Sequence, residues 1–187
     1  MILIFSAPSG SGKSTLVNYL LDNRDDLEFS VSATTRAPRG TEQHGKEYYF
    51  IPAESFRRLI DDDAFVEYEQ VYNDCYYGTL KSEIDRISRN GHHVVFDVDV
   101  KGGANLKRIF GDDALALFIA PPSVDVLRER LQRRGTDSPE KIEERVAKAE
   151  TEMQDAPLFD HVIVNDKLDL AKEQTLNLVN NFLDKDN

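Results

Sequence analysis

Four apolar runs divide the chain, and each has the length of a strand buried in a sheet. They are Met1–Phe5, His93–Val100, Ala114–Ala120 and His161–Asn165. Continuous apolar runs of this kind are typical of strands that are covered on both faces of a parallel sheet. Helix-like segments separate the runs at the start of the chain and through its second half. This alternation predicts an α/β fold, a parallel sheet with helices on both faces.

The predicted helices have apolar residues at helical spacing. Ser138 is placed to cap one of them, with Pro139 in its first turn, and Ile142, Val146, Ala149 and Met153 form its apolar stripe. Ser123 is placed to cap the helix before it. The helices are expected over Lys13–Leu21, Leu80–Arg89, Val124–Leu131, from Glu140 onward, and over Leu168–Leu183.

A segment with a different pattern interrupts this alternation between about residues 30 and 79. Phe29–Thr35, Tyr48–Ile51 and Phe65–Val71 are short alternating or aromatic-rich runs that predict strands. Pro52–Asp61 predicts a short helix, and Tyr72–Gly78 reads as a polar aromatic loop. We therefore expect an inserted β-rich lobe in this part of the chain.

The first apolar run leads into a glycine-rich loop, Ala7-Pro8-Ser9-Gly10-Ser11-Gly12, and Lys13-Ser14-Thr15 then begins a helix. Strand, glycine loop and helix in this order are typical of a nucleotide phosphate loop, whose backbone N–H groups surround phosphate oxygens. Lys13 would reach the β- and γ-phosphates of ATP, and the Ser14 hydroxyl would ligate Mg²⁺. Ala7 replaces the first glycine of the usual pattern. The alternative is a Gly/Ser turn followed by a chance lysine.

Arg36 and Arg39 flank a proline in the inserted segment. Guanidinium groups bind phosphate through two parallel hydrogen bonds, so the pair could be an anion clamp. A solvated turn is the alternative. Glu67 lies in a strand of alternating apolar and polar residues. A carboxylate in such a strand usually lies on the solvent-facing side, which is the alternative to a role in binding.

Asp97 and Asp99 close the second apolar run, and residues two apart in a strand point to the same face. Ligands of open parallel sheets bind beyond the carboxyl ends of the strands, so Asp97 is a candidate partner of Mg²⁺. The alternative is that the two carboxylates cap the following helix at Gly102. We do not expect His92 or His93 to ligate a metal, because no other ligand stands at suitable spacing.

Arginines lie on both sides of the loop between the two predicted helices that follow the third apolar run. This arrangement predicts either a mobile lid that closes over transferring phosphates or a solvated charged face paired with glutamates. The arginines are Arg128, Arg130, Arg133, Arg134 and Arg145.

Composition narrows the class of protein. The 187 residues carry a net charge of -11, which argues against a general nucleic-acid binder. The single cysteine, Cys75, cannot form an internal disulfide, and no signal peptide or membrane-length apolar run is visible. We therefore expect a cytoplasmic protein that binds neither nucleic acid nor a membrane. No obligatory protein partner is evident from the sequence.

The chain resembles the guanylate kinase family, a group of P-loop nucleoside monophosphate kinases, over nearly its whole length. The resemblance is carried, in family order, by APSGSGKST, VSATTRAPRGTEQHGKEYYF, FVEYEQ, YYGT, VVFDVD, IAPPS, RLQRRGTDSPEKIEERV and VIVND. One departure is an extra residue between Glu67 and Tyr77, which leaves the placement of residues 73–76 open. The resemblance implies transfer of a phosphoryl group from ATP, with Mg²⁺, to GMP and dGMP.

The resemblance also implies roles for single residues and regions. ATP would be bound by Ala7, Pro8, Ser9, Gly10, Ser11, Gly12, Lys13, Ser14, Thr15 and Asn165, and Mg²⁺ by Ser14 and Asp97. The GMP phosphate would be bound by Arg36, Arg39, Tyr48 and Tyr77, and the guanine base by Ser32, Glu67, Thr79 and Asp99, with Gly78 also at the GMP site. Catalysis would use Lys13, Arg36, Arg130, Arg134 and Arg145. The implied regions are a core (1–30, 80–122 and 157–187), a nucleotide-monophosphate-binding lobe (about 31–79) and a helical lid (about 123–156).

Two other functions stay open on the sequence. One is a guanylate-kinase-like protein-binding module without catalysis, which would be expected to lack Lys13 or the lid arginines. The other is a P-loop kinase for a different phosphorylated acceptor, against which the guanine-reading set Ser32, Glu67, Thr79 and Asp99 argues.

Overall fold

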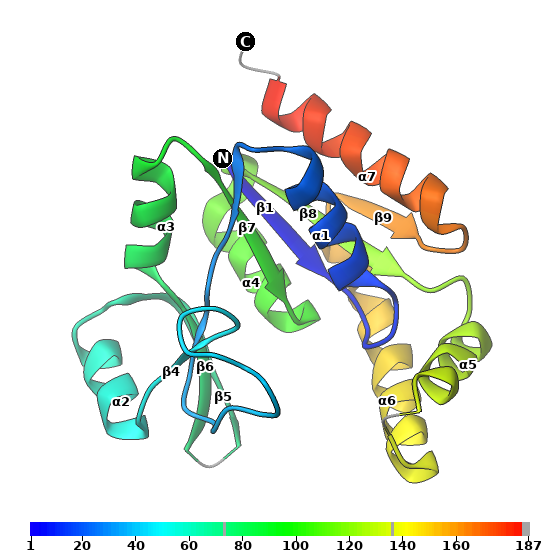
Figure 1. Cartoon of the computed structure of the whole chain (residues 1–187), viewed down its shortest axis with the longest axis horizontal. Coiled ribbons are helices and arrows are strands. Elements are labelled where there is room, and N and C mark those ends of the chain that lie inside the picture. The colour runs from blue at the N-terminus through cyan, green and yellow to red at the C-terminus, as the bar shows by residue number, and fades with distance from the viewer. Residues whose placement is uncertain (73, 136, 185–187) are drawn as a thin grey trace. The chain divides into compact units, whose positions relative to one another are not determined.

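The computed structural model describes residues 1–72, 74–135 and 137–184 (Figure 1). The chain divides into two compact units, Met1–Leu27 with Val95–Asn187, and Glu28–Val94. A five-stranded sheet organises the first unit and a four-stranded sheet the second. The α/β class predicted from the alternating pattern is confirmed.

The five-stranded sheet has the strand order β2-β7-β1-β8-β9. Its strands are β1 (Ile2–Ser6), β2 (Leu27–Phe29), β7 (His93–Val98), β8 (Ala114–Ala120) and β9 (His161–Val164). The registers are parallel, with Ile2 opposite Ala114 and Leu117 opposite His161. Every residue of β1 and β8 is buried, as their apolar runs predict. Helices α1 (Lys13–Asn23) and α7 (Leu168–Leu183) lie side by side on one face, and α4 (Val100–Phe110) packs on the other (Figure 1).

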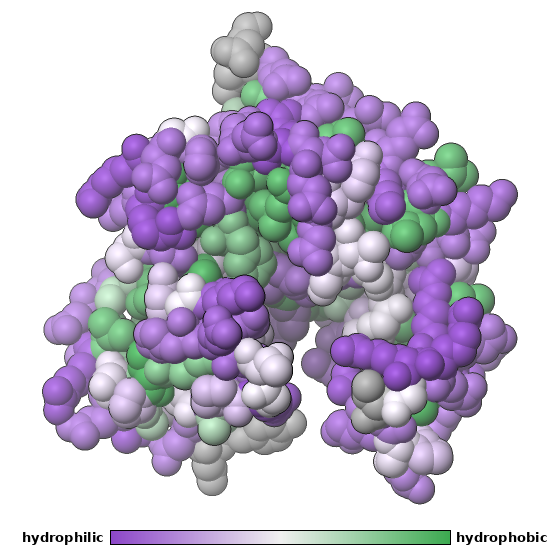
Figure 2. Space-filling model, in the orientation of Figure 1, coloured by the Kyte–Doolittle hydropathy of each residue, from purple (hydrophilic) through white to green (hydrophobic). Residues whose placement is uncertain are grey.

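One predicted buried strand is exposed in the structure. In β9 only Ile163 is buried, whereas Val162 and Val164 are 43% and 52% exposed. The strand is the last of its sheet, so it has a neighbour on one side only and its apolar side chains are incompletely covered. The prediction of a buried strand was wrong here because an apolar run does not distinguish an edge strand from a central one. On the face drawn in Figure 2, hydrophilic residues predominate and hydrophobic residues form smaller patches.

The second sheet has the order β4-β3-β6-β5 and mixes parallel and antiparallel pairs. Its strands are β3 (Ala33–Thr34), β4 (Tyr49–Phe50), β5 (Phe65–Tyr72) and β6 (Cys75–Leu80), with helices α2 (Ala53–Asp61) and α3 (Lys81–Arg89) in the same unit. The core of this unit forms around Ala33, Phe56 and Phe65. The rings of Phe56 and Phe65 stack with centroids 4.3 Å apart.

Two predictions for this region were wrong. Phe29–Thr35 is not one strand, because β2 ends at Phe29 in the first sheet and β3 begins at Ala33 in the second. Tyr72–Gly78 is not a loop, because Cys75 pairs with Tyr72 across a tight hairpin and starts β6. The tyrosines of this segment favour a strand, and Asp74 takes the left-handed conformation with φ 56 that a tight turn needs. Asn73, within the predicted longer loop, lies outside the described residues.

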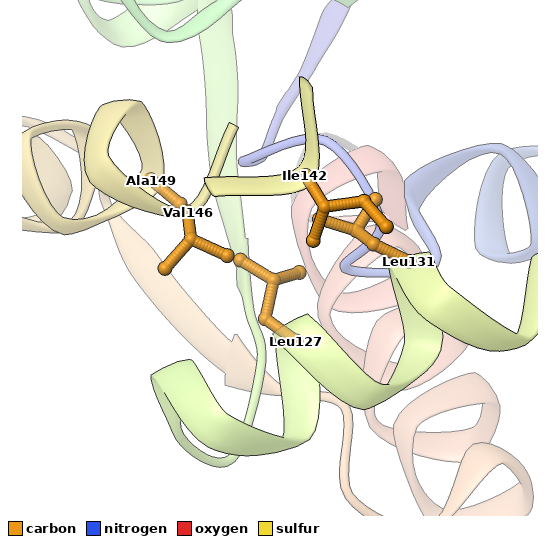
Figure 3. Packing of buried hydrophobic residues seen from close by; sticks show 5 residues of the cluster. All are labelled: Leu127, Leu131, Ile142, Val146 and Ala149. Carbon is orange, nitrogen blue, oxygen red and sulfur yellow. The ribbon is translucent and has the colours of Figure 1, made fainter. Parts of the chain in front are cut away.

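The two helices with the arginines form a hairpin in the first unit. The first is α5 (Val124–Arg134), capped by Ser123, and the second is α6 (Pro139–Glu152), capped by Ser138. They pack through one apolar cluster, Leu127, Leu131, Ile142, Val146 and Ala149 (Figure 3). Met153 was expected in the same stripe but is only partly buried, because α6 ends at Glu152 and a 3-10 helix, η2 (Met153–Leu158), follows. A second 3-10 helix, η1 (Gly111–Asp113), precedes β8.

The Leu127–Leu131 side of this cluster gives a stability prediction. Leu131→Ala should lower the free energy of unfolding by about 2–5 kcal/mol, because Leu131 is fully buried and its loss leaves a cavity. Leu170→Ala makes the same chemical change at a side chain that is 60% exposed and should cost about 0.5 kcal/mol or less. Denaturant unfolding of both variants measures the difference. Equal losses would contradict the packing described here.

Candidate active site

The glycine-rich loop between β1 and α1 is shaped by two residues in the left-handed region, Gly10 with φ 95 and Gly12 with φ 91. The Ser11 backbone N–H donates to the Pro8 carbonyl at 3.1 Å, which closes the turn. A Cβ on Gly12 would lie 2.3 Å from the side-chain nitrogen of Asn165, so no other residue fits there. Ala7 is buried at the end of the strand, where a compact side chain suffices. The loop leads directly into α1 at Lys13, as predicted.

Lys13 and Asp97 meet at the carboxyl end of β7. The ammonium group of Lys13 forms an ion pair with the Asp97 carboxylate and donates to the Val98 carbonyl at 2.6 Å. Ser14 follows Lys13 in the first turn of α1 and is exposed. The structure therefore pairs the predicted cation with Asp97, one of the two oxygen groups that the sequence singled out, and Ser14 follows that cation in the chain.

The carboxylate of Asp99 caps a helix, whereas that of Asp97 pairs with Lys13. The Asp99 carboxylate accepts from the Gly102 N–H at 2.8 Å and caps α4, which is the alternative raised for both aspartates. The Asp99 carbonyl accepts from the Ser6 hydroxyl at 3.1 Å. The capping interpretation holds for Asp99 and not for Asp97, because the helix begins only at Val100.

Two arginines of the α5–α6 hairpin contact the glycine-rich loop or the residue that supports it. Arg145 donates to the Ser9 hydroxyl at 2.7 Å and lies 3.3 Å from the carboxylate of Asp137. Arg130 donates to the Asn165 carbonyl at 2.8 Å, and the Asn165 side chain donates to the Ser11 carbonyl at 2.8 Å. Asn165 is therefore a link between the loop and α5.

The other arginines of the hairpin are exposed or pair with acidic side chains. Arg134 is exposed at the end of α5. Arg128 pairs with Glu143 at 2.9 Å and with Asp125 at 3.0 Å, which fits the solvated charged face proposed as the alternative.

In the second unit, Arg36 is enclosed by aromatic side chains. Its Nε donates to the Tyr77 hydroxyl at 3.1 Å. Its guanidinium lies 4.9 Å from the ring centre of Tyr48 and 5.5 Å from that of Phe50, both within cation–π range. Tyr48 and Tyr77 contact each other edge to face. Arg36, Tyr48 and Tyr77, three residues predicted to bind one phosphate, thus form one cluster, and the exposed Arg39 lies in the adjoining loop.

Glu42 belongs to this cluster and was missed by the sequence analysis. Its carboxylate accepts from both terminal nitrogens of Arg36, at 2.6 and 2.8 Å, and from the backbone N–H of Arg39 at 2.7 Å. These bonds raise the pKa of Arg36 and lower the pKa of Glu42 from 4.5 to about 2. A carboxylate three residues after Arg39 in the same loop was the available signal.

Glu67 and Thr79 face each other across neighbouring strands. They are directly opposite in the β5–β6 register, and the Thr79 hydroxyl donates to Glu67 at 3.0 Å. Tyr77 lies two residues before Thr79 and therefore on the same face of β6. Between them, Gly78 is buried, and a Cβ there would lie 2.8 Å from a ring carbon of Phe65. Ser32 directly precedes β3, and its carbonyl accepts from the Tyr49 N–H at 2.9 Å.

The described parts of the chain contain neither a metal-binding cluster of side chains nor a membrane-spanning helix. Residues 1–72, 74–135 and 137–184 hold no group of three or more His, Cys, Asp or Glu side chains that could enclose a metal ion. Within the same ranges, no helix is both long and apolar enough to cross a membrane.

The Glu42–Arg36 pair gives a pH prediction. The carboxyl of Glu42 should titrate with a midpoint near pH 2 instead of 4.5, which carbon-13 NMR of that carboxyl measures. Because the folded pKa lies below the ordinary value, the pair's contribution to stability is complete above about pH 4.5 and is lost as the pH falls through about 2. Arg36→Gln should return the midpoint toward 4.5. A wild-type midpoint near 4.5 would show that the pair does not form in solution.

Comparisons with known proteins agree on one family. A family model described as guanylate kinase matches residues 1–184. A guanylate kinase of Bacteroides thetaiotaomicron is 56% identical over 185 residues, 99% of this chain and 91% of the relative. One of Porphyromonas gingivalis is 55% identical and covers 98% of each chain. The crystal structure of guanylate kinase from Anaplasma phagocytophilum matches with a TM-score of 0.73 at 30% identity, over 96% of this chain and 84% of that one. This chain therefore belongs to the guanylate kinase family.

Proposed function

We propose that this chain transfers the γ-phosphoryl group of ATP to GMP, and to dGMP, giving ADP and GDP or dGDP. Family membership makes the chain a nucleotide kinase. The observation that carries the choice of acceptor is the placement of Glu67 and Thr79 on one face of the second sheet, in the unit that also holds the Arg36–Tyr48–Tyr77 cluster. One unit thus holds groups that can bind a base, Glu67 and Thr79, and a cluster that can bind a phosphate. This combination suits a nucleoside monophosphate as the acceptor.

Guanine selection follows from the donors on the base. Guanine presents N1–H and N2–H side by side, and the two oxygens of one carboxylate can accept from both. Adenine has no such pair of donors. Glu67 supplies the carboxylate in this proposal, and the hydroxyls of Ser32 and Thr79 would donate to O6. For this the Thr79 hydroxyl would turn from Glu67, to which it donates in this structure. Asp99 is proposed as a second acceptor for guanine.

The phosphate of GMP is assigned to Arg36, Arg39, Tyr48 and Tyr77. Guanidinium and phenol groups donate to phosphate oxygens, and the aromatic rings hold Arg36 in place. In this structure Glu42 occupies both terminal nitrogens of Arg36. A carboxylate of the protein itself already binds this guanidinium, which supports the assignment of an anionic group to the same position.

The triphosphate of ATP is assigned to the loop from Ala7 to Thr15, with Asn165 beside it. Asp97 and Ser14 offer hard oxygen ligands, which suits Mg²⁺, an ion that keeps several waters and relies on substrate phosphates. We therefore propose that these two residues hold Mg²⁺, which when bound would offset charge on the β- and γ-phosphates. Lys13, Arg130, Arg134 and Arg145 would stabilise the remaining negative charge during transfer.

The acceptor is already a phosphate anion, so no side-chain general base is needed. The protein must instead hold two mutually repelling anions in line and exclude water. We assign the lid to about 123–156, the acceptor lobe to about 31–79 and the core to the remainder, and we place the enzyme in the cytosol. The Arg145–Ser9 bond supports a lid that closes on the phosphate loop.

Two alternatives have specific observations against them. A binding module without catalysis has no need of the Lys13–Asp97 pair or of arginines at the phosphate loop, and both are present. A P-loop kinase for another acceptor has no need of a carboxylate opposite Thr79.

An acceptor panel tests the proposed function directly. ADP release from Mg²⁺–ATP should be fast with GMP and dGMP and slow with AMP, UMP, CMP and a ribosyl phosphate. Turnover with a different acceptor would contradict the guanine assignments and keep the phosphate-loop mechanism. Absence of turnover in folded protein that still binds GMP would favour the binding module.

The Glu67→Gln variant tests the proposed contact between Glu67 and guanine separately from the rest of the site. The amide accepts through one oxygen only, so kcat/KM for GMP should fall about 10- to 150-fold, matching the loss of about 1.5–3 kcal/mol for a bond to a charged group. The slow reaction with AMP should not fall. Glu54→Gln, which neutralises an exposed glutamate of the same unit, is the matched control and should change neither. Parallel loss with both nucleotides would contradict the assignment.

A further inference from the structure

Glu83, in the first turn of α3, is a buried carboxylate that the proposed reaction does not use. Its residue is 3% exposed, among the most buried charged groups of the described chain. Burying a carboxylate is costly unless hydrogen bonds and a counter-charge compensate it. The partners of this carboxylate therefore indicate what it does.

The carboxylate joins three parts of the second unit. One oxygen accepts from the backbone N–H of Val31 at 3.0 Å, and the other accepts from the Tyr49 hydroxyl at 3.2 Å. Arg86, one turn along α3, donates to Glu83 at 2.6 Å. Arg86 also pairs with Glu28, whose carboxylate lies 3.1 Å from the His92 ring. The Val31 N–H and the Tyr49 hydroxyl therefore come from outside α3, whereas the Arg86 guanidinium belongs to α3 itself.

Charge at this position is well compensated. Burial raises the pKa of Glu83, but the hydrogen bonds from Arg86 and Val31 outweigh burial and leave the pKa lowered. Burial and the neighbouring carboxylate raise the pKa of Tyr49, so its hydroxyl stays protonated and can donate. An ionised Glu83 can accept all of these bonds at once, which a neutral side chain of the same shape cannot.

The two bonds outside α3 end next to proposed GMP ligands. Val31 directly precedes Ser32, and Tyr49 directly follows Tyr48. The Tyr49 N–H bonds to the Ser32 carbonyl at 2.9 Å, which ties the two segments to each other. Tyr48 directly precedes β4, and the Arg36 guanidinium lies over Tyr48 and Phe50, whereas Tyr49 between them packs against the core cluster. Because extended residues alternate between faces, fixing Tyr49 on the core side fixes Tyr48 on the side of Arg36.

We propose that Glu83 is a positioning residue for GMP: it holds Ser32 and Tyr48 in the arrangement that receives the base and the phosphate. This inference rests on the proposed function and adds a residue that touches no substrate. It predicts an effect on GMP binding that is separate from the phosphoryl-transfer step and from ATP.

Steady-state kinetics of Glu83→Gln and Tyr49→Phe test the proposal. Glu83→Gln should raise KM for GMP about tenfold, the equivalent of about 1.4 kcal/mol. Tyr49→Phe removes one hydroxyl and should raise KM for GMP by a smaller factor. In both variants kcat and KM for ATP should stay within about twofold of wild type. Glu54→Gln on α2 is the control and should leave all constants unchanged.

The pattern of constants separates positioning from a general loss of structure. A smaller folded fraction lowers apparent kcat and leaves KM for GMP unchanged, and that result would overturn the proposal. Equal rises in KM for GMP and ATP would also overturn it. If Glu83→Gln does not fold, Tyr49→Phe decides, and an unchanged KM for GMP would overturn the proposal. Wild-type turnover of GMP, measured alongside, tests the proposed function independently.

Discussion

Close packing around Gly10 and Gly12 constrains the whole first unit. A Cβ on Gly10 would lie 3.0 Å from carbons of both Leu127 and Leu131, and one on Gly12 would collide with Asn165. The phosphate loop is thus pressed between α5 and the segment after β9, elements more than a hundred residues away in sequence. Gly10 and Gly12 both adopt positive φ, which glycine does without steric cost, and the lack of a side chain also lets these neighbours pack close to the loop. Leucines of α5 and the Asn165 side chain therefore pack directly against this one loop.

In both units the cation assigned to phosphate is held by a carboxylate of the protein itself. Asp97 pairs with Lys13 and Glu42 pairs with Arg36. An acidic chain with a net charge of -11 can thereby keep cations fixed in position without leaving them uncompensated. Under the proposed function, phosphate would replace each carboxylate as the partner of a cation that is already held in place.

The sequence predicted the parts of this structure that depend on neighbours along the chain. The buried runs of β1 and β8, the serine caps of α5 and α6 and the strand–loop–helix around Lys13 all follow from local pattern. The exposure of Val162 and Val164 depends on strand order, which no local run contains. The role inferred for Glu83 depends on its hydrogen bond with Val31, 52 positions away in sequence. That of Glu42 depends on a loop that folds back on Arg36. Paired carboxylates of this kind look like ordinary surface charges in a sequence.

The hairpin of β5 and β6 has a practical consequence for solution studies. Cys75, the first residue of β6, is the chain's single cysteine, and its side chain is partly exposed. It lies two positions before Tyr77, on the strand that also carries Thr79. A thiol-reactive fluorophore would therefore attach at one site, in the proposed acceptor lobe, without any engineering of the chain. Its emission could follow nucleotide binding in real time while the phosphate-loop unit carries no label.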